Sequence, residues 1–207
     1  MTVTGPVRLE VLVEEPSAEL ALRSLLPRIV PECPFKIYIF NGKHDLLRRL
    51  PQRLRAYSSY WSEANLRVVV LLDRDGDDCV RLKAELERIA VASSLPSHAV
   101  MFRIVIEELE AWFLGDVPAL CHAYPRLPAS LGQQDGYRDP DAVRGTWEAL
   151  ERVLRKHGYH RKGLAKYVAA GEVAPHMDVD NNRSRSFQVF RDGLRRLVKE
   201  GGRGAQA

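Results

Sequence analysis

The first 106 residues alternate between strand-like and helix-like patterns four times, and this alternation constrains the fold more than any other feature. Strand-like segments are rich in β-branched and apolar residues, whereas the segments between them repeat apolar residues at helical spacing. The predicted strands cover residues 7–13, 35–40, 67–72 and 100–106, and the predicted helices cover residues 17–29, 45–57 and 78–92. Strands that alternate with helices form an α/β fold with a mostly parallel sheet.

The second half of the chain lacks strand patterns. Helical segments are predicted near residues 107–123, 140–157, 160–170 and 184–199, with a loop rich in Pro, Gly and Asp over 125–140. We therefore expect a four-stranded, mostly parallel sheet flanked by helices, followed by a helical C-terminal elaboration packed on that core. The expected division is 1–116 for the α/β core, 117–200 for the elaboration and 201–207 for a disordered tail.

Several classes of protein are excluded by composition. No apolar run reaches the roughly 18 residues that a membrane span needs, and the N-terminus lacks a signal-peptide pattern. The three cysteines are odd in number and widely separated, which argues against a disulfide framework or a zinc site. We expect a cytoplasmic protein with no membrane partner.

The net charge of +4 hides an uneven distribution. Residues 1–150 hold 18 basic and 21 acidic residues, whereas residues 151–207 hold 13 basic and 6 acidic ones. An acidic body with a basic final section favours a polyanionic partner such as DNA or RNA, and a solvated helical face is the alternative.

Four carboxylates occur within six positions after the third predicted strand, in Asp73-Arg74-Asp75-Gly76-Asp77-Asp78. In an open α/β sheet, ligands bind at the carboxyl ends of the strands. Asp73 and Asp75 present oxygen ligands that suit a hard cation such as Mg²⁺, so we predict that they bind a metal. Asp77 and Asp78 are predicted to cap the following helix.

Two further acidic groups follow the first and fourth strands. Glu14 and Glu15 come after the first, and Glu107, Glu108 and Glu110 come after the fourth. If these strands lie beside the third one, the carboxylates converge at one edge of the sheet. Such a cluster suits one or two Mg²⁺ ions and phosphoryl transfer to water. Alternatively, each group only favours the positive end of a helix dipole.

Basic residues supply candidate contacts for a nucleic acid. Lys43 and Arg48 belong to the second helix, and a denser group with an aromatic residue, Tyr159, lies at Lys156, His160, Arg161 and Lys162. Such a group could hold phosphates and stack a base, or be a solvated helix end. The segment from Asn181 to Ser186 could bind an anion, although Ser184 is better explained as a helix N-cap. No phosphate loop is present, so we expect no ATP hydrolysis by this chain alone.

Short motifs in a fixed order carry a family resemblance. They are Val13-Glu14-Glu15-Pro16-Ser17-Ala18-Glu19, Gly42-Lys43, Leu72-Asp73-Arg74-Asp75, Glu108-Leu109-Glu110-Ala111-Trp112 and Ser184-Arg185-Ser186-Phe187. With them the chain resembles the Toprim domain of topoisomerases, primases and OLD-type nucleases. It resembles more closely a bacterial Toprim-like family of unknown function, often encoded beside AAA/ABC-type ATPases. The resemblance covers nearly the whole chain.

The resemblance implies a nuclease that uses Mg²⁺ or Mn²⁺ on DNA or RNA. Asp73 and Asp75 would be metal ligands, Glu14 a general acid/base or metal-linked glutamate, and Glu110 a further site carboxylate, with Glu107 as an additional candidate ligand. An ATPase partner, a role in anti-phage defence and a homodimer are further expectations.

Two alternatives stay open at this stage. Many Toprim sequences carry Gly directly after the first glutamate, whereas this chain has Glu15, which favours a non-catalytic binding or sensor subunit of an ATPase complex. A small-molecule phosphohydrolase, including one with an aspartate nucleophile, is the weakest alternative.

Overall fold

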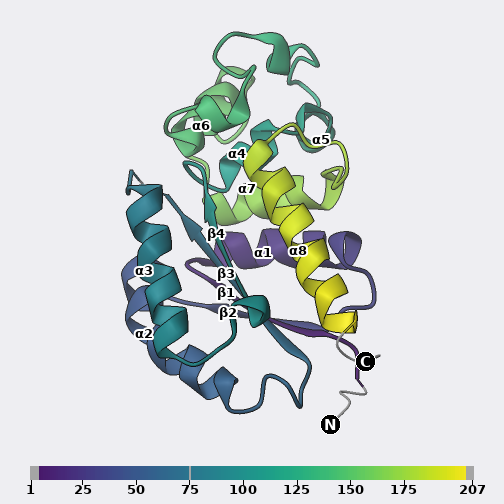
Figure 1. Cartoon of the computed structure of the whole chain (residues 1–207). Helices are drawn as coiled ribbons and strands as arrows, with labels where there is room; N and C mark the ends of the chain where they lie inside the picture. Colours follow the sequence, from purple (N-terminus) through teal and green to yellow (C-terminus); the bar gives the residue numbers. More distant parts are fainter. Residues whose placement is uncertain (1–4, 75, 204–207) are drawn as a thin grey trace.

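A four-stranded, all-parallel sheet forms the centre of the molecule, with the strand order β2-β1-β3-β4 (Figure 1). The computed structural model describes residues 5–74 and 76–203. The strands are β1 (Arg8–Val13), β2 (Phe35–Ile39), β3 (Leu66–Asp73) and β4 (Val100–Val105). The helices that connect them are α1 (Pro16–Ile29), α2 (Gly42–Ser58) and α3 (Cys79–Ala92), with the short 3-10 turn η1 (Ser97–Ala99) before β4.

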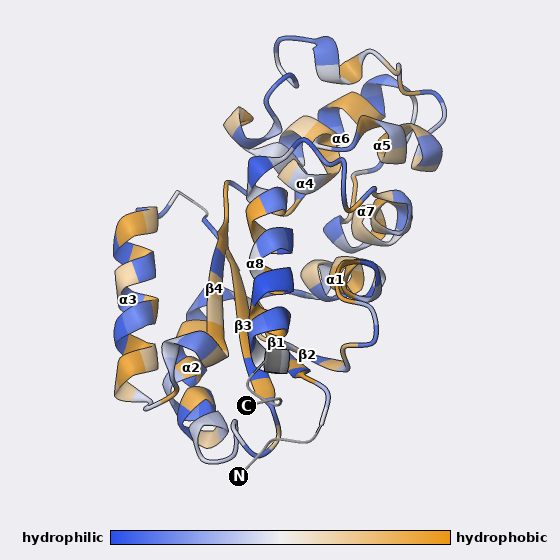
Figure 2. Ribbon diagram, turned by 45° about the vertical axis from the view of Figure 1, so that its right-hand side comes forward, coloured by the Kyte–Doolittle hydropathy of each residue, from blue (hydrophilic) through white to orange (hydrophobic). Residues whose placement is uncertain are grey.

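The second half is helical, as the sequence predicts. It contains α4 (Glu110–Leu114), α5 (Val117–Ala123), α6 (Thr146–Lys156), α7 (Lys166–Val173) and α8 (Arg185–Arg203), with 3-10 turns η2 (Leu131–Gln133), η3 (Pro140–Ala142) and η4 (Ala174–His176). Helices α1 and α8 cover one face of the sheet, and α2 and α3 cover the other (Figure 2).

The side chains of β3 alternate between these two faces. Val69 and Leu71 belong to the core beneath α1 and α8, whereas Val70 and Leu72 belong to the core beneath α2 and α3. Because successive residues of a strand point to opposite faces, both cores are filled from one continuous apolar run. Asp73 continues the odd-numbered series and therefore lies on the face that carries α1 and the helical half.

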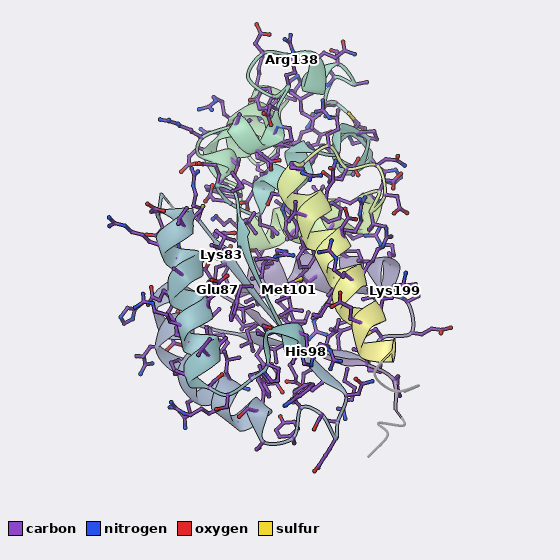
Figure 3. All side chains as sticks on the ribbon, viewed as in Figure 1. Lys83, Glu87, His98, Met101, Arg138 and Lys199 are labelled. Carbon is purple, nitrogen blue, oxygen red and sulfur yellow. The ribbon has the colours of Figure 1, made fainter. Side chains whose placement is uncertain are left out.

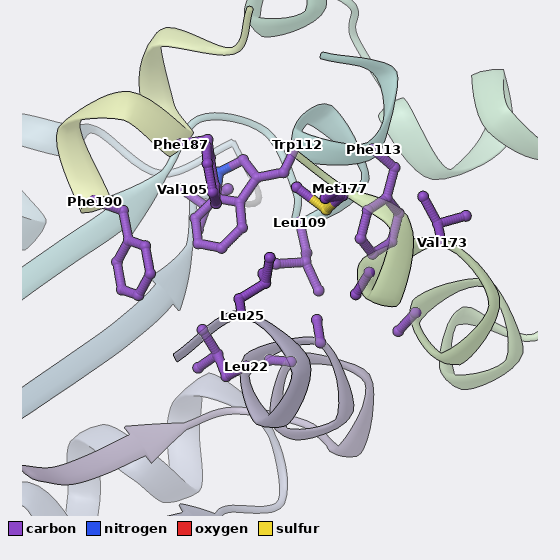
Figure 4. Packing of buried hydrophobic residues seen from close by; sticks show 14 of the residues in the cluster. Leu22, Leu25, Val105, Leu109, Trp112, Phe113, Val173, Met177, Phe187 and Phe190 are labelled. Atoms are coloured by element: carbon purple, nitrogen blue, oxygen red, sulfur yellow. The ribbon is translucent and has the colours of Figure 1, made fainter. Parts of the chain in front are cut away.

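One hydrophobic core joins this face of the sheet to the helical half. Trp112 of α4 is fully buried and packs against Phe187 and Phe190 of α8, with ring centroids 5.2 and 5.0 Å away. Leu22 and Leu25 of α1 lie below this aromatic group (Figure 4). The core therefore continues across the expected boundary at residue 116.

The single helix expected over residues 107–123 is wrong, because the chain breaks at Gly115 and Asp116. A Cβ at Gly115 would lie 2.2 Å from Oδ1 of Asn182, so only glycine allows that loop to approach. Asp116 then caps α5, because its side chain accepts a hydrogen bond from the Ala119 amide at 3.0 Å.

Two other expected boundaries are wrong. The helix expected over 160–170 begins only at Lys166, after two residues with positive φ, His160 and Gly163. The first three residues of the tail expected from residue 201 are helical, because α8 continues to Arg203, and Gly201 is buried. Residues 204–207 lie outside the described residues.

Two of the three predicted caps, Asp78 and Ser184, are confirmed, whereas Oδ2 of Asp77 instead accepts a hydrogen bond from Nζ of Lys43 at 2.8 Å. The Asp78 side chain accepts hydrogen bonds from the amides of Val80 and Arg81, at 2.8 and 3.2 Å. Ser184 accepts one from the Phe187 amide at 3.1 Å, at the start of α8. Within the described residues, no helix combines the length and the apolar character that a membrane crossing requires.

Candidate functional site

The candidate site lies where the strand order changes direction. From β1 the chain moves to β2 on one side and then to β3 and β4 on the other, so β1 and β3 are the central neighbours. A crevice at the carboxyl ends of two such strands is the usual ligand site of an open parallel sheet. Glu14 follows β1 and Asp73 ends β3. Oε1 of buried Glu14 accepts a hydrogen bond from the Asp73 amide at 2.6 Å.

Asp73 is in an environment that disfavours its ionised form. Burial raises its pKa well above the ordinary value, and the negative charges of Glu14 and Glu110 raise it further. Lys166 acts in the opposite direction, and Glu15 adds to the rise. These mutual effects show that the structure brings together carboxylates from the ends of β1 and β3 and from the start of α4.

Glu110 is the most unusual of these residues. Its side chain is 1% exposed, and neither carboxylate oxygen has a hydrogen-bond partner among the residues that the structure describes. Burial raises the pKa of Glu110 to about 7, with Lys166 acting to lower it and Glu108 and Glu15 adding to the rise. A buried polar group without a partner is costly, and such groups mark functional positions or an absent ion.

Lys166, in the first turn of α7, provides a positive charge for this cluster. Its Nζ lies 2.7 Å from Oε1 of Glu108 and 4.0 Å from Oε1 of Glu15. Burial alone would lower the pKa of Lys166, but Glu110, Glu108 and Glu15 together raise it above the usual value. Lys166 is therefore a firmly protonated cation beside the carboxylates.

Glu108 and Glu15 have structural partners of their own. Glu108 accepts hydrogen bonds from the Trp147 amide at 2.9 Å and from Oγ1 of Thr146 at 3.3 Å, so it caps α6. Burial alone would raise the pKa of Glu108, but the hydrogen bonds from Lys166 and from the Trp147 amide lower it. Glu15 accepts a hydrogen bond from Oγ of Ser17 at 2.5 Å.

A second group of charges lies beside the first. Glu107 forms an ion pair with Arg74, so the structure gives it a partner outside the carboxylate cluster. Nζ of Lys43 donates to the Arg74 carbonyl at 3.1 Å and to Oδ2 of Asp77 at 2.8 Å. Lys43, a predicted nucleic-acid contact, therefore lies at the loop after β3, next to the site.

The donor chemistry of Glu14, Asp73 and Glu110 fits a hard divalent cation, and the unpartnered oxygens of Glu110 are available to one. In the described part of the chain, however, no three Asp, Glu, His or Cys side chains are grouped so as to hold a metal ion. Asp75, the other predicted ligand, lies outside the described residues. The three carboxylates would have to move closer together to share one ion.

The remaining predicted nucleic-acid contacts include paired and exposed side chains. Arg48 forms an ion pair with Asp45 in α2. Lys156, Arg161 and Lys162 are exposed, whereas Nε2 of His160 lies 3.3 Å from Oε2 of Glu172.

Neither Tyr159 nor the start of α8 is left open. The Tyr159 ring packs on Tyr124, with a centroid distance of 5.1 Å, and on the Arg126 guanidinium at 4.1 Å, so it is not free to stack a base. The start of α8, which could have bound an external anion, is occupied by the Asp141 carboxylate. Its Oδ2 accepts hydrogen bonds from the Arg185 and Ser186 amides.

Lys166 was missed by sequence reasoning. Its place in the first turn of α7, where the helix dipole disfavours a cation unless carboxylates compensate, was not available as a signal, because the predicted helix began at residue 160. Recognising it required knowing that α7 packs on α1, which delivers Glu15.

These features define an α/β protein with an all-parallel sheet and a carboxylate cluster at the ends of its central strands. A family model described as Domain of unknown function (DUF4276) matches residues 13–195, so the chain belongs to this family. The matched range includes Glu14, Asp73, Glu110 and Lys166. No curated protein and no solved structure matches the chain. The likeness to Toprim domains stays a prediction.

Proposed function

We propose that the chain is a Toprim-like, Mg²⁺- or Mn²⁺-dependent nuclease that hydrolyses phosphodiester bonds of DNA or RNA. The observation that carries the proposal is the buried carboxylate cluster at the β1/β3 crevice, above all the Glu110 oxygens without partners. Several carboxylates in a buried site with raised pKa values are characteristic of functional sites, because folding gains nothing from such a cluster by itself.

In this proposal Asp73 and Glu110 would hold the metal, together with Asp75. The ion would supply Lewis-acid stabilisation of the phosphate and a lowered pKa for a bound water. Glu14, whose Oε1 accepts from the Asp73 amide, would position the end of β3. The pKa of about 7 that burial gives Glu110 belongs to the metal-free site, and a bound cation would lower it and keep the carboxylate ionised as a ligand. Lys43, beside the loop after β3, would contact a phosphate of the substrate.

The work with an AAA/ABC-type ATPase partner and the role in anti-phage defence rest on the sequence resemblance alone.

The experiment is a cleavage assay with plasmid DNA and tRNA in Mg²⁺ or Mn²⁺, with and without a neighbouring AAA/ABC-type ATPase of the kind that the resemblance implies. We expect cleavage by the wild type and loss of cleavage in Asp73→Asn. Asp135→Asn is the matched control, because its side chain is 95% exposed in a loop of the helical half. Cleavage that persists unchanged in Asp73→Asn would refute the assignment of activity to this site.

A second candidate function is a non-catalytic binding or sensor subunit, and Lys166 favours it. Its ammonium group already neutralises Glu108 and Glu15, so the cluster has an internal cation. Calorimetric titration with Mn²⁺ separates the two proposals. The nuclease requires Mn²⁺ binding that Asp73→Asn abolishes, whereas the sensor subunit requires neither Mn²⁺ binding nor cleavage.

A further inference from the structure

The outer edge of β4 lies at the bottom of a groove between α3 and α8 (Figure 1). The groove consists of two hollows, of about 530 and 320 Å³, which share Arg103. The larger hollow is bounded by Lys83 and Glu87 of α3 and by Met101 of β4, which lie near one another in Figure 3. The smaller one is largely apolar and runs between Ile104 and Phe190. We call the two hollows together the β4 groove.

Backbone N–H and C=O groups of β4 that bond to no described strand face this groove. The Val105 carbonyl accepts a hydrogen bond from the Arg74 amide at 3.0 Å and so faces β3. Because backbone polar groups alternate in direction along a strand, those of Phe102, Ile104 and Ile106 face the groove. In the described residues no strand pairs with this edge.

Two side chains form hydrogen bonds with these outward backbone groups. Nη1 of Arg103 donates to the Phe102 carbonyl at 2.9 Å, and the Ile106 amide donates to Oγ of Ser186 at 3.3 Å. These are single side-chain bonds, and a partner strand would replace them with a regular ladder. Ile104 lies between them, at the centre of the groove.

The groove is also positively charged. Three arginines line it, Arg103, Arg185 and Arg196, and none of them forms a salt bridge in the described part of the chain. Nε of Arg103 is buried, and no described residue forms a hydrogen bond with it. Burial lowers the pKa of Arg103, and the positive charge of Arg196 lowers it further, so both guanidinium groups would be stabilised by a carboxylate.

The acidic residues of the groove do not neutralise these arginines. Glu87 lies 3.8 Å from Lys83 on the same helix. Asp141 is engaged by the start of α8, and Glu200 acts on Arg67. An anionic partner would therefore meet Arg103 and Arg196, which form no ion pair with an acidic residue in the described part of the chain, whereas the charge of Arg185 already helps to lower the pKa of Asp192.

We propose that the β4 groove binds an extended acidic segment of a partner protein, which adds to the sheet as a fifth strand. Main-chain hydrogen bonds to Phe102, Ile104 and Ile106 would provide affinity, and a carboxylate at Arg103 and Arg196 would provide specificity. A neighbouring apolar side chain of the segment would fill the smaller hollow. This proposal is independent of the proposed nuclease activity.

Two other occupants fit the groove less well, one because of its charge and the other because of the β4 backbone. A second copy of this chain, paired edge to edge, would bring the same arginines against each other, which is destabilising. A nucleic acid would satisfy the arginines but would not pair with the outward amide and carbonyl groups of β4. The peptide and variant measurements distinguish both of these occupants from an acidic segment.

The experiment measures fluorescence anisotropy of a labelled octapeptide that alternates Glu and Val. The matched probes are a Lys and Val octapeptide and the Glu and Val peptide with alternate backbone nitrogens methylated. We expect the acidic peptide to bind, and each matched probe to bind at least about tenfold more weakly. Hydrogen exchange of the β4 amides should slow when the acidic peptide is added.

Two variants locate the binding in the groove. Ile104→Pro removes an outward amide that the sheet does not use, which is the kind of proline an edge strand tolerates, and should weaken binding at least about tenfold. Arg196→Gln, at an exposed position, should weaken it several-fold without affecting the fold. Arg81→Gln, with its side chain 90% exposed on α3 and outside the groove lining, is the matched control and should bind as the wild type does.

Each contrary result overturns the proposal. Equal binding of the acidic and methylated peptides, or no slowing of β4 exchange, would exclude strand addition. No binding of the acidic peptide, or equal binding of the lysine peptide, would exclude an acidic ligand. Dimerisation that Ile104→Pro abolishes would assign the edge to a second copy. Binding of a short single-stranded DNA that Arg196→Gln weakens and Ile104→Pro leaves intact would assign it to nucleic acid.

Discussion

Replacing Glu110 by glutamine should make the protein more stable at alkaline pH while barely changing its stability in mild acid. The carboxyl group is 1% exposed, and its oxygens have no hydrogen-bond partners within the described ranges 5–74 and 76–203. The folded state therefore favours the protonated form, and burial raises the pKa of Glu110 from 4.5 to about 7. Glutamine resembles that neutral form in shape and charge.

The size of the effect follows from proton linkage. Between pH 4.5 and pH 7 the folded state binds more protons at Glu110 than the unfolded state does, so its contribution to the free energy of unfolding falls as pH rises. A pKa difference of one corresponds to about 1.4 kcal/mol, so the rise from 4.5 to about 7 lowers the free energy of unfolding by about 3 kcal/mol once Glu110 is fully ionised. We expect Glu110→Gln to gain less than about 1 kcal/mol at pH 5 and about 3 kcal/mol at pH 8.

The assay is urea unfolding of both proteins in metal-free buffer across this pH range, with thermal unfolding as a second measurement. A gain of about 3 kcal/mol corresponds to roughly 6–12 °C in Tm for a chain of this size. Glu85→Gln, an exposed position on α3, is the control and should change stability by no more than about 0.5 kcal/mol at any pH.

One result would refute this reasoning. If Glu110→Gln were equally or more destabilising at pH 8 than at pH 5, the ionised carboxylate would stabilise the folded protein. The description of Glu110 as buried and without a partner would then be wrong.

The raised pKa of Asp73 works in the same direction, so the free energy of unfolding of the variant should still fall with pH, but less steeply. The raised pKa of Lys166 acts only at alkaline pH, where stability falls as the lysine deprotonates.

Three further predictions concern the framework of the site and are measured by urea unfolding. Asp78→Ala should cost about 1 kcal/mol, because α3 loses its N-cap, and Asp78→Asn should restore most of that loss. Gly115→Ala should cost about 1–3 kcal/mol, since its Cβ would lie 2.7 Å from the Ser184 amide, and a neutral result would contradict this close approach. Trp112→Ala should cost about 3–5 kcal/mol by emptying the core between α4 and α8, whereas Trp112→Phe should cost less.

The α/β core was largely predictable from local sequence. Continuous or alternating apolar runs marked all four strands, and the run before Asp73 indicated a strand covered on both faces. The helical half was less predictable. Its apolar periodicity is local, but the break at Gly115 depends on Asn182, which is distant in the sequence.

The site was predictable only in part for the same reason. Glu14, Asp73 and Glu110 were identified because each follows a predicted strand. Their convergence required β1, β3 and β4 to be neighbours, and sequence order does not specify strand order. Lys166 was not identified, because its role comes from the packing of α7 on α1.

The sequence by itself determined the alternation of strands and helices, the acidic strand ends and the polarity of each face, since these depend on neighbouring residues. For the part of the chain that the structure describes, tertiary contacts decided that Glu110 is buried without a partner, that Lys166 neutralises Glu15 and Glu108, and that β4 is an open edge. The pKa values, charge pairs and free edges of this protein depend on contacts between segments far apart in the chain, which only folding brings together.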